Sequence, residues 1–156
     1  MTVKITLLLT LLAYAVITSQ SFMYLLSLKY VQLKLNANAY TELRKLTDIS
    51  MRANFKYVIY TALLANALLI ILTIKTPYSI VFITVVLAFV CLIADIMLTL
   101  KGSLPVNDII NSWSVNNYPA DWTEFRTKWF TVFKYRQIAN IIGFSSLVTG
   151  AVFGLK

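Results

Sequence analysis

Residues 105–140 read PVNDIINSWSVNNYPADWTEFRTKWFTVFKYRQIAN, and the rest of the chain is arranged around this stretch. It holds all three tryptophans, three of the six acidic residues and four of the fourteen basic residues of a 156-residue chain. Most of the remaining sequence consists of long apolar runs. We therefore expect any functional site of the protein to use this stretch as one of its walls.

Composition assigns the chain to a broad class. Hydrophobic residues make up 59% of it and charged residues 13%, whereas soluble domains carry roughly 45–50% apolar and about 25% charged residues. This balance predicts a small integral membrane protein with a single domain, residues 1–156. The net charge of +8 comes from basic residues that flank apolar runs, as topology and lipid headgroups require. We therefore expect the lipid bilayer as a partner, and no nucleic acid.

The chain lacks the residues that several kinds of chemistry need. It has no histidine and a single cysteine, Cys91, so an intrachain disulfide is excluded. A protein-built zinc site is not expected, and a histidine-ligated haem or copper centre is excluded. A serine–histidine or cysteine–histidine nucleophile pair is excluded as well. We expect no metal and no cofactor.

Four apolar runs have the length that a hydrocarbon core of about 30 Å requires. They cover about residues 5–28, 57–74, 80–100 and 138–155. The expected fold is all-α, an integral membrane four-helix bundle. A cleaved signal peptide is the alternative for the first run, since Lys4 precedes it, but a signal peptide has an apolar region of only about 7–15 residues. We favour a retained span.

The two longer connections, about residues 29–56 and 103–137, are expected to form amphipathic interfacial helices. In the first, Arg44, Asp48 and Arg52 recur every four residues and Lys45 lies three before Asp48. Opposite charges can therefore pair along one helical face. We interpret this segment as a solvated connection that faces lipid headgroups rather than as a binding element.

The distribution of basic residues predicts the orientation. Four spans place both termini and the turn at residues 75–79, where Pro77 disfavours a continuing helix, on one side of the membrane. That side carries three of the fourteen basic residues, Lys4, Lys75 and Lys156, and the other side carries the remaining eleven. The positive-inside rule then puts both longer loops in the cytoplasm and both termini outside, in a bacterial inner (plasma) membrane.

Asp95 is the only acid within a predicted span. An ionised carboxylate there costs roughly 2.5–3.5 kcal/mol on insertion scales, so it should face the protein interior. Small and polar residues share its helical face: Thr84, Ala88, Cys91 and Thr99. Asp95 either forms a structural ion pair, with Arg136 or Arg126, or handles a proton or orients a ligand.

A second stripe lies in the last helix, which we expect to begin near Asp121, just after Pro119. Six residues at spacings of three and four share one face: Trp122, Arg126, Trp129, Phe133, Arg136 and Asn140. The stripe is either one wall of a pocket or an interfacial belt of aromatic and basic anchors. Further along, Gly150 and Gly154 form a GxxxG pattern, which predicts close helix packing within the chain first and a homo-oligomer second.

Together these residues resemble a known family. Pro105-Val-Asn107, Trp113, Pro119-Ala-Asp121-Trp122, Arg126, Trp129 and Arg136 are similar to the pattern of the anthrone-oxygenase-like family of small four-helix membrane proteins. The resemblance implies a compact membrane bundle and, from the characterised members, oxygenation of a polycyclic phenolic substrate by dioxygen. It also makes Asn107, Trp122, Arg126 and Arg136 family-pattern positions. Many members carry histidine where this chain has Phe133, a departure that leaves the activity open.

Two functions from different classes follow. The first is a membrane-embedded protein that binds a lipophilic small molecule, with cofactor-independent, oxygenase-like chemistry on a phenol or quinone implied by the resemblance. Asp95 is then the candidate catalytic base, and Arg126 and Arg136 stabilise the oxyanion. The other candidate ligand-binding residues are Trp122, Trp129, Asn140, Asn107, Asn66, Gln20 and Tyr24. The alternative is a non-catalytic accessory subunit or lipid-binding structural protein of a membrane complex.

Overall fold

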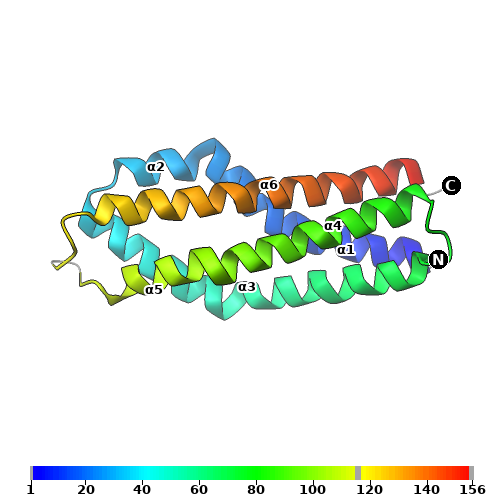
Figure 1. Cartoon of the computed structure of the whole chain (residues 1–156), viewed down its shortest axis with the longest axis horizontal. Coiled ribbons are helices and arrows are strands. Elements are labelled where there is room, and N and C mark those ends of the chain that lie inside the picture. The colour runs from blue at the N-terminus through cyan, green and yellow to red at the C-terminus, as the bar shows by residue number, and fades with distance from the viewer. Residues whose placement is uncertain (1, 115–116, 155–156) are drawn as a thin grey trace.

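The fold is described by a computed structural model, which covers residues 2–114 and 117–154. Over these residues all regular structure is helical, in four long helical stretches joined by short connections (Figure 1), as expected from the sequence. In chain order the elements are α1 (Thr2–Met23), η1 (Tyr24–Leu28), α2 (Lys29–Lys34), α3 (Ala37–Thr73), α4 (Ile80–Leu98), η2 (Thr99–Ser103), α5 (Leu104–Ser112) and α6 (Trp122–Gly154).

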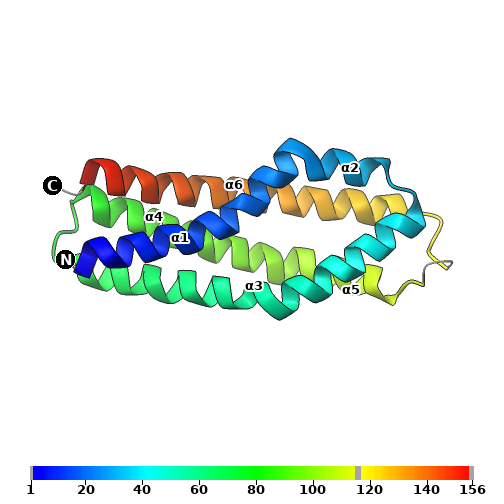
Figure 2. The same ribbon diagram turned by 180° about the vertical axis from the view of Figure 1, so that it is seen from behind.

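The helical stretches run alternately up and down the bundle. The chain termini and the α3–α4 turn lie at one end, and the α2–α3 link and the α5–α6 connection lie at the other (Figures 1 and 2). Helix α1 packs on α3 and α6, and α4 packs on α3 and α6. Each stretch therefore contacts its neighbours around a closed ring, and the interior is shared by all four.

All four stretches are long and apolar enough to cross a membrane: Thr2–Lys34, Ala37–Thr73, Ile80–Ser112 and Trp122–Gly154. Large apolar side chains on their outer faces are exposed, among them Leu26, Leu64 and Ile71. In water such a surface would be unfavourable, whereas hydrocarbon solvates it. The composition of the bundle surface thus agrees with the membrane protein expected from the sequence.

Two helices are longer than the expected spans. Helix α3 continues without a break from the first long connection into the expected second span, because residues 37–73 contain neither glycine nor proline. It begins where Asn36 caps it, its Oδ1 accepting from the Ala39 N–H at 3.0 Å. Likewise, α6 is continuous from Trp122 to Gly154. The interfacial position of residues 29–56 and 103–137 stays a prediction.

Two helical stretches contain a wider π-helical turn, η1 and η2. In η1 the Lys29 N–H donates to the Tyr24 carbonyl, and in η2 the Leu104 N–H donates to the Thr99 carbonyl. Pro105 follows η2 and has no N–H to donate, so the α-helical ladder is interrupted at this point. Such turns often occur at functional sites, where they change the direction of side chains.

Small residues let α6 lie close to its neighbours. A Cβ atom at Gly150 would collide with Thr84 Oγ1 of α4, and one at Gly154 would collide with Val81 of the same helix. The GxxxG pattern therefore packs within the chain, as expected. At Gly143 an added Cβ would lie 2.6 Å from Tyr14 Cζ, and the Tyr14 hydroxyl donates to the Ala88 carbonyl at 3.0 Å. This contact ties α1, α4 and α6 together.

The buried side chains form two clusters. One is aliphatic and includes Leu7, Ile17, Leu69, Val85 and Leu147. The other is largely aromatic and includes Tyr24, Tyr40, Trp113, Trp129 and Phe133. Several residues of the aromatic cluster are in direct contact with buried charged groups, which makes this part of the bundle the place to look for a site.

Candidate functional site

A buried ion pair joins α4 to α6. Arg136 Nε donates to Asp95 Oδ1 at 2.8 Å, and Arg136 Nη1 donates to the Ser103 hydroxyl at 3.3 Å. The sequence predicted a pair with Arg136 or Arg126, and Arg136 is confirmed as the partner. Asp95 is only 1% exposed, yet its second oxygen, Oδ2, has no hydrogen-bond partner among the described residues.

A second network joins α3 to α5 through Asn107. Arg44 Nη2 donates to Asn107 Oδ1 at 2.8 Å, and Asn107 Nδ2 donates to Asp48 Oδ1 at 2.7 Å. Since arginine can only donate and a carboxylate can only accept, Asn107 is held in one orientation. Asn111 Nδ2 donates to the other Asp48 oxygen at 2.7 Å.

Arg44 and Asp48 are each 4% exposed. The interpretation of this segment as a solvated connection is therefore wrong for this face of α3. The physical reason is that α5 packs against the beginning of α3 and excludes solvent from it. The expected pairing of Asp48 with Arg52 is confirmed at 2.8 Å. Lys45 does not pair with Asp48 and donates instead to the Trp113 carbonyl.

Aromatic rings connect the two networks. The Arg44 guanidinium lies over Trp129, 3.9 Å from the ring centroid, and Trp129 stacks on Phe133 with centroids 4.8 Å apart. The Arg136 guanidinium lies 5.5 Å from the Phe133 ring. Tyr24 packs on both rings. The stripe predicted along α6 thus separates two buried guanidinium groups by two stacked rings.

Both networks line one cavity of about 470 Å³. Its polar lining includes Arg44, Asp48, Asp95, Asn107, Trp129 and Arg136. An apolar stripe along α3 forms another part of the wall: Met51, Phe55, Ile59 and Leu63, spaced four residues apart.

The mouth of the cavity lies between α3 and η2. Tyr60 and Leu100 both line the cavity and are more than half exposed on the outside of the bundle. Arg52 stands at the same side, half-exposed, and its Nη2 pairs with Asp108 Oδ1 of α5 at 2.6 Å. The cavity therefore opens sideways through the wall of the bundle.

The structure separates the candidate site residues into two groups. Asp95, Arg136, Trp129, Asn107 and Gln20 line the cavity, and Tyr24 lies beside it, where its hydroxyl accepts from Gln32 Nε2 at 2.9 Å. The cavity lining does not include Trp122, Arg126, Asn66 or Asn140.

Arg126 has a structural position instead. Its Nη1 lies 3.3 Å from the carbonyl oxygens of Gln32, Leu33 and Leu35, and its guanidinium lies 4.6 Å from the Trp122 ring centroid. A cation at the last carbonyls of a helix satisfies acceptors that have no helical partner. Arg126 and Trp122 therefore hold the end of α2 against α6.

Asn140 and Asn66 lie elsewhere in the interior. Thr18 of α1 donates to the Asn140 carbonyl at 3.2 Å. Asn66 is fully buried in α3 and its amide makes no hydrogen bond within the described part of the chain.

Sequence reasoning missed Arg44 and Asp48 as members of the site. A usable signal was present, since Tyr40, Arg44 and Asp48 recur every four residues and the same side of the helix continues into Met51 and Phe55. A stripe that changes from polar to apolar along one helix indicates a buried face more than a solvated one.

Comparison of the chain with known protein families, with curated proteins and with solved structures finds no match. The resemblance to the anthrone-oxygenase-like family therefore stays a prediction.

Proposed function

We propose that this protein binds a lipophilic small molecule in the cavity between α3 and the α4–α5 stretch. One observation carries the proposal: buried arginine, aspartate and asparagine side chains share a cavity with an apolar wall. Its volume of about 470 Å³ falls in the usual range for small-molecule sites, roughly 300–1,000 Å³. A few placed polar groups on an apolar wall are typical of such sites.

The position of the mouth supports a ligand that comes from the bilayer. In a membrane, an opening between α3 and η2 would face lipid, because the helices on both sides carry exposed apolar residues such as Leu64 and Leu100. We propose a bacterial inner membrane with both termini outside, which puts the α5 end of the bundle toward the cytoplasm. The polar networks then lie on the cytoplasmic side.

The resemblance adds a reaction to this proposal. With an anthrone-type substrate, Asp95 would accept a proton from the ring CH2 group, and the carbanion would add dioxygen to give a peroxide. Return of the proton and loss of water leave a carbonyl, so CH2 and O2 become C=O and H2O. Arg136 would stabilise the oxyanion of the substrate. The free Oδ2 of Asp95 supports its role as the base.

Native mass spectrometry of the protein, extracted gently from its own membrane, tests the binding. We expect a bound molecule of defined mass that is lost from the Arg136→Ala variant and retained by Lys134→Ala, which removes an exposed cation two residues away. Bound polypeptides in fixed ratio without any small molecule would contradict the proposal and support the accessory-subunit alternative. Full turnover of a genuine substrate by Asp95→Asn would exclude the catalytic role of Asp95.

A further inference from the structure

The cavity contains balanced buried charges. Arg44 and Arg136 contribute two positive charges, and Asp48 and Asp95 contribute two negative charges, all on residues that are at most 9% exposed. Arg52 and Lys56 also line the cavity, but both are exposed residues at its mouth, and Arg52 is paired with Asp48 and with Asp108 of α5. A ligand with a net charge would unbalance the buried groups and lose its own hydration. The charge balance favours an uncharged ligand.

The remaining hydrogen-bonding capacity indicates what such a ligand carries. Asp95 Oδ2 is a buried acceptor without a donor, and Arg44 Nε and Trp129 Nε1 are buried donors without an acceptor, as far as the described residues go. Leaving such groups unpaired costs free energy, so a ligand that pairs with them binds more tightly. A carboxylate or phosphate group could accept from Arg44 or Trp129 but would repel Asp95. A hydroxyl group donates to Asp95 and keeps the site neutral.

We propose that the ligand is an uncharged amphiphile with a hydroxyl group that donates to Asp95 Oδ2. This inference rests on the proposed function and adds the chemical class of the ligand. The apolar body of the molecule packs on Met51, Phe55 and Ile59 of α3, and an acceptor on the same molecule satisfies Arg44 or Trp129.

Three probe molecules with the same dodecyl-length alkyl chain test the chemical class of the ligand. They are dodecanol, dodecyl methyl ether and dodecanoate, the last at a pH well above its pKa. Each is added at equal mole fraction to the wild-type protein in nanodiscs, and retention is measured by native mass spectrometry. We expect dodecanol to be retained about tenfold more tightly than the ether, which lacks the donor, and than the anion.

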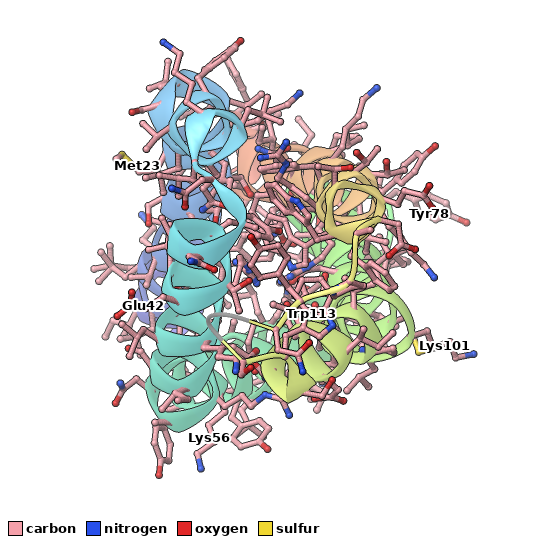
Figure 3. The ribbon with its side chains drawn as sticks, turned by 90° about the vertical axis from the view of Figure 1, so that its left-hand side faces the viewer. Met23, Glu42, Lys56, Tyr78, Lys101 and Trp113 are labelled. Atoms are coloured by element: carbon pink, nitrogen blue, oxygen red, sulfur yellow. The ribbon has the colours of Figure 1, made fainter. Side chains whose placement is uncertain are left out.

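A charge variant supplies a second readout. Asp95→Asn leaves the buried groups with one excess positive charge, so the preference should move from the alcohol toward dodecanoate. Glu42→Gln is the matched control, since Glu42 lies on the same helix as Arg44 but points away from the interior (Figure 3). It removes one negative charge and should leave the order of the probes unchanged.

The outcomes distinguish the lipophile-binding function from the inference about the class of the ligand. The order in which the wild-type protein retains the three probes can be measured even where a variant does not fold. Dodecanoate retained as well as dodecanol would overturn the uncharged class while the lipophile site stands. Equal retention of alcohol and ether would overturn the hydrogen bond to Asp95. Retention of none of the probes would overturn this inference together with the lipophile-binding function.

Discussion

Asn107 is the residue through which two buried charges of opposite sign share one network. Its amide oxygen accepts a hydrogen bond from the Arg44 guanidinium, and its amide nitrogen donates a hydrogen bond to the Asp48 carboxylate. Neither charged group reaches the other directly in the hydrogen bonds observed, so the amide acts as a bridge. A side chain of similar size without these two functions would leave both charges short of partners in a buried place.

Asn107→Leu should therefore destabilise the fold by about 3 kcal/mol, from the loss of two hydrogen bonds to charged groups. The measurement is thermal or denaturant unfolding in detergent. Unfolding is monitored by the reaction of a thiol-specific dye with Cys91, which is buried and is the only cysteine of the sequence. Asn54→Leu is the control, since Asn54 is exposed and donates only to its own helix. A loss as large in the control as in Asn107→Leu would contradict the bridge.

The Arg136–Asp95 pair is suited to a double-mutant cycle. Removing one partner leaves a buried charge alone, so Arg136→Met should cost about 3–5 kcal/mol. The combination with Asp95→Asn removes both charges and should return stability to within about 1 kcal/mol of the wild type. The same unfolding assay measures the stability of each variant. A double variant whose loss of stability equals the sum of the two single-variant losses would mean that Arg136 and Asp95 are not coupled.

At the level of helices, close contact of α6 with α1 and α4 depends on glycine. Gly143 is buried beneath the Tyr14 ring, and the Tyr14 hydroxyl is fixed by the Ala88 carbonyl of α4. The ring cannot easily move away from an added methyl group, because it is fully buried. One glycine thus sets the distance between three helices.

Gly143→Ala should destabilise the bundle by about 1–3 kcal/mol through overpacking, although alanine is intrinsically the better helix former. Unfolding temperature in a mild detergent measures the effect. Ser145→Thr adds a methyl group to the exposed side of the same helix and should change stability by less than about 0.5 kcal/mol. An unchanged unfolding temperature for Gly143→Ala would show that α1 can shift to make room.

The site residues that could be predicted from the sequence are those marked by helical spacing or by the cost of a charge inside a span. Spacing alone aligned Trp129, Phe133 and Arg136, and Asp95 needed a partner because a span is costly for a lone charge. For Arg44, the spacing marks one face of α3 but does not show what covers that face. The cover is α5, which continues the α4 stretch beyond the π-helical turn at residues 99–103 and packs against the beginning of α3. Helical spacing on either side does not reveal that turn.

At the level of the whole molecule, both termini and the α3–α4 turn lie at the end of the bundle opposite the α5–α6 connection. The arrangement fits an even number of membrane crossings. The proposed orientation assigns the turn to the outside and the α5 end to the cytoplasm, where most basic residues lie.

Single cysteines test this orientation in a Cys91→Ala background. Tyr78→Cys lies in the exposed turn, and Ser112→Cys lies at the exposed end of α5. In intact bacterial cells a membrane-impermeant maleimide should label Tyr78→Cys, and it should reach Ser112→Cys only after the cells are permeabilised. The reverse pattern would overturn the orientation and leave the bundle itself unaffected.

The π-helical turn η2 has a genetic consequence. A π-helical turn holds one residue more than the α-helix around it, and one residue corresponds to a rotation of about 100° around a helix axis. The wider turn absorbs the rotation of that extra residue, so deleting a single codon within residues 99–103 would restore an ordinary helix and leave Asn107 facing Arg44 and Asp48. A deletion in an unbroken α-helix has no such slack and rotates one side of the helix against the other. The gene can therefore lose one codon at η2 while the scaffold and the binding site both keep their side-chain directions.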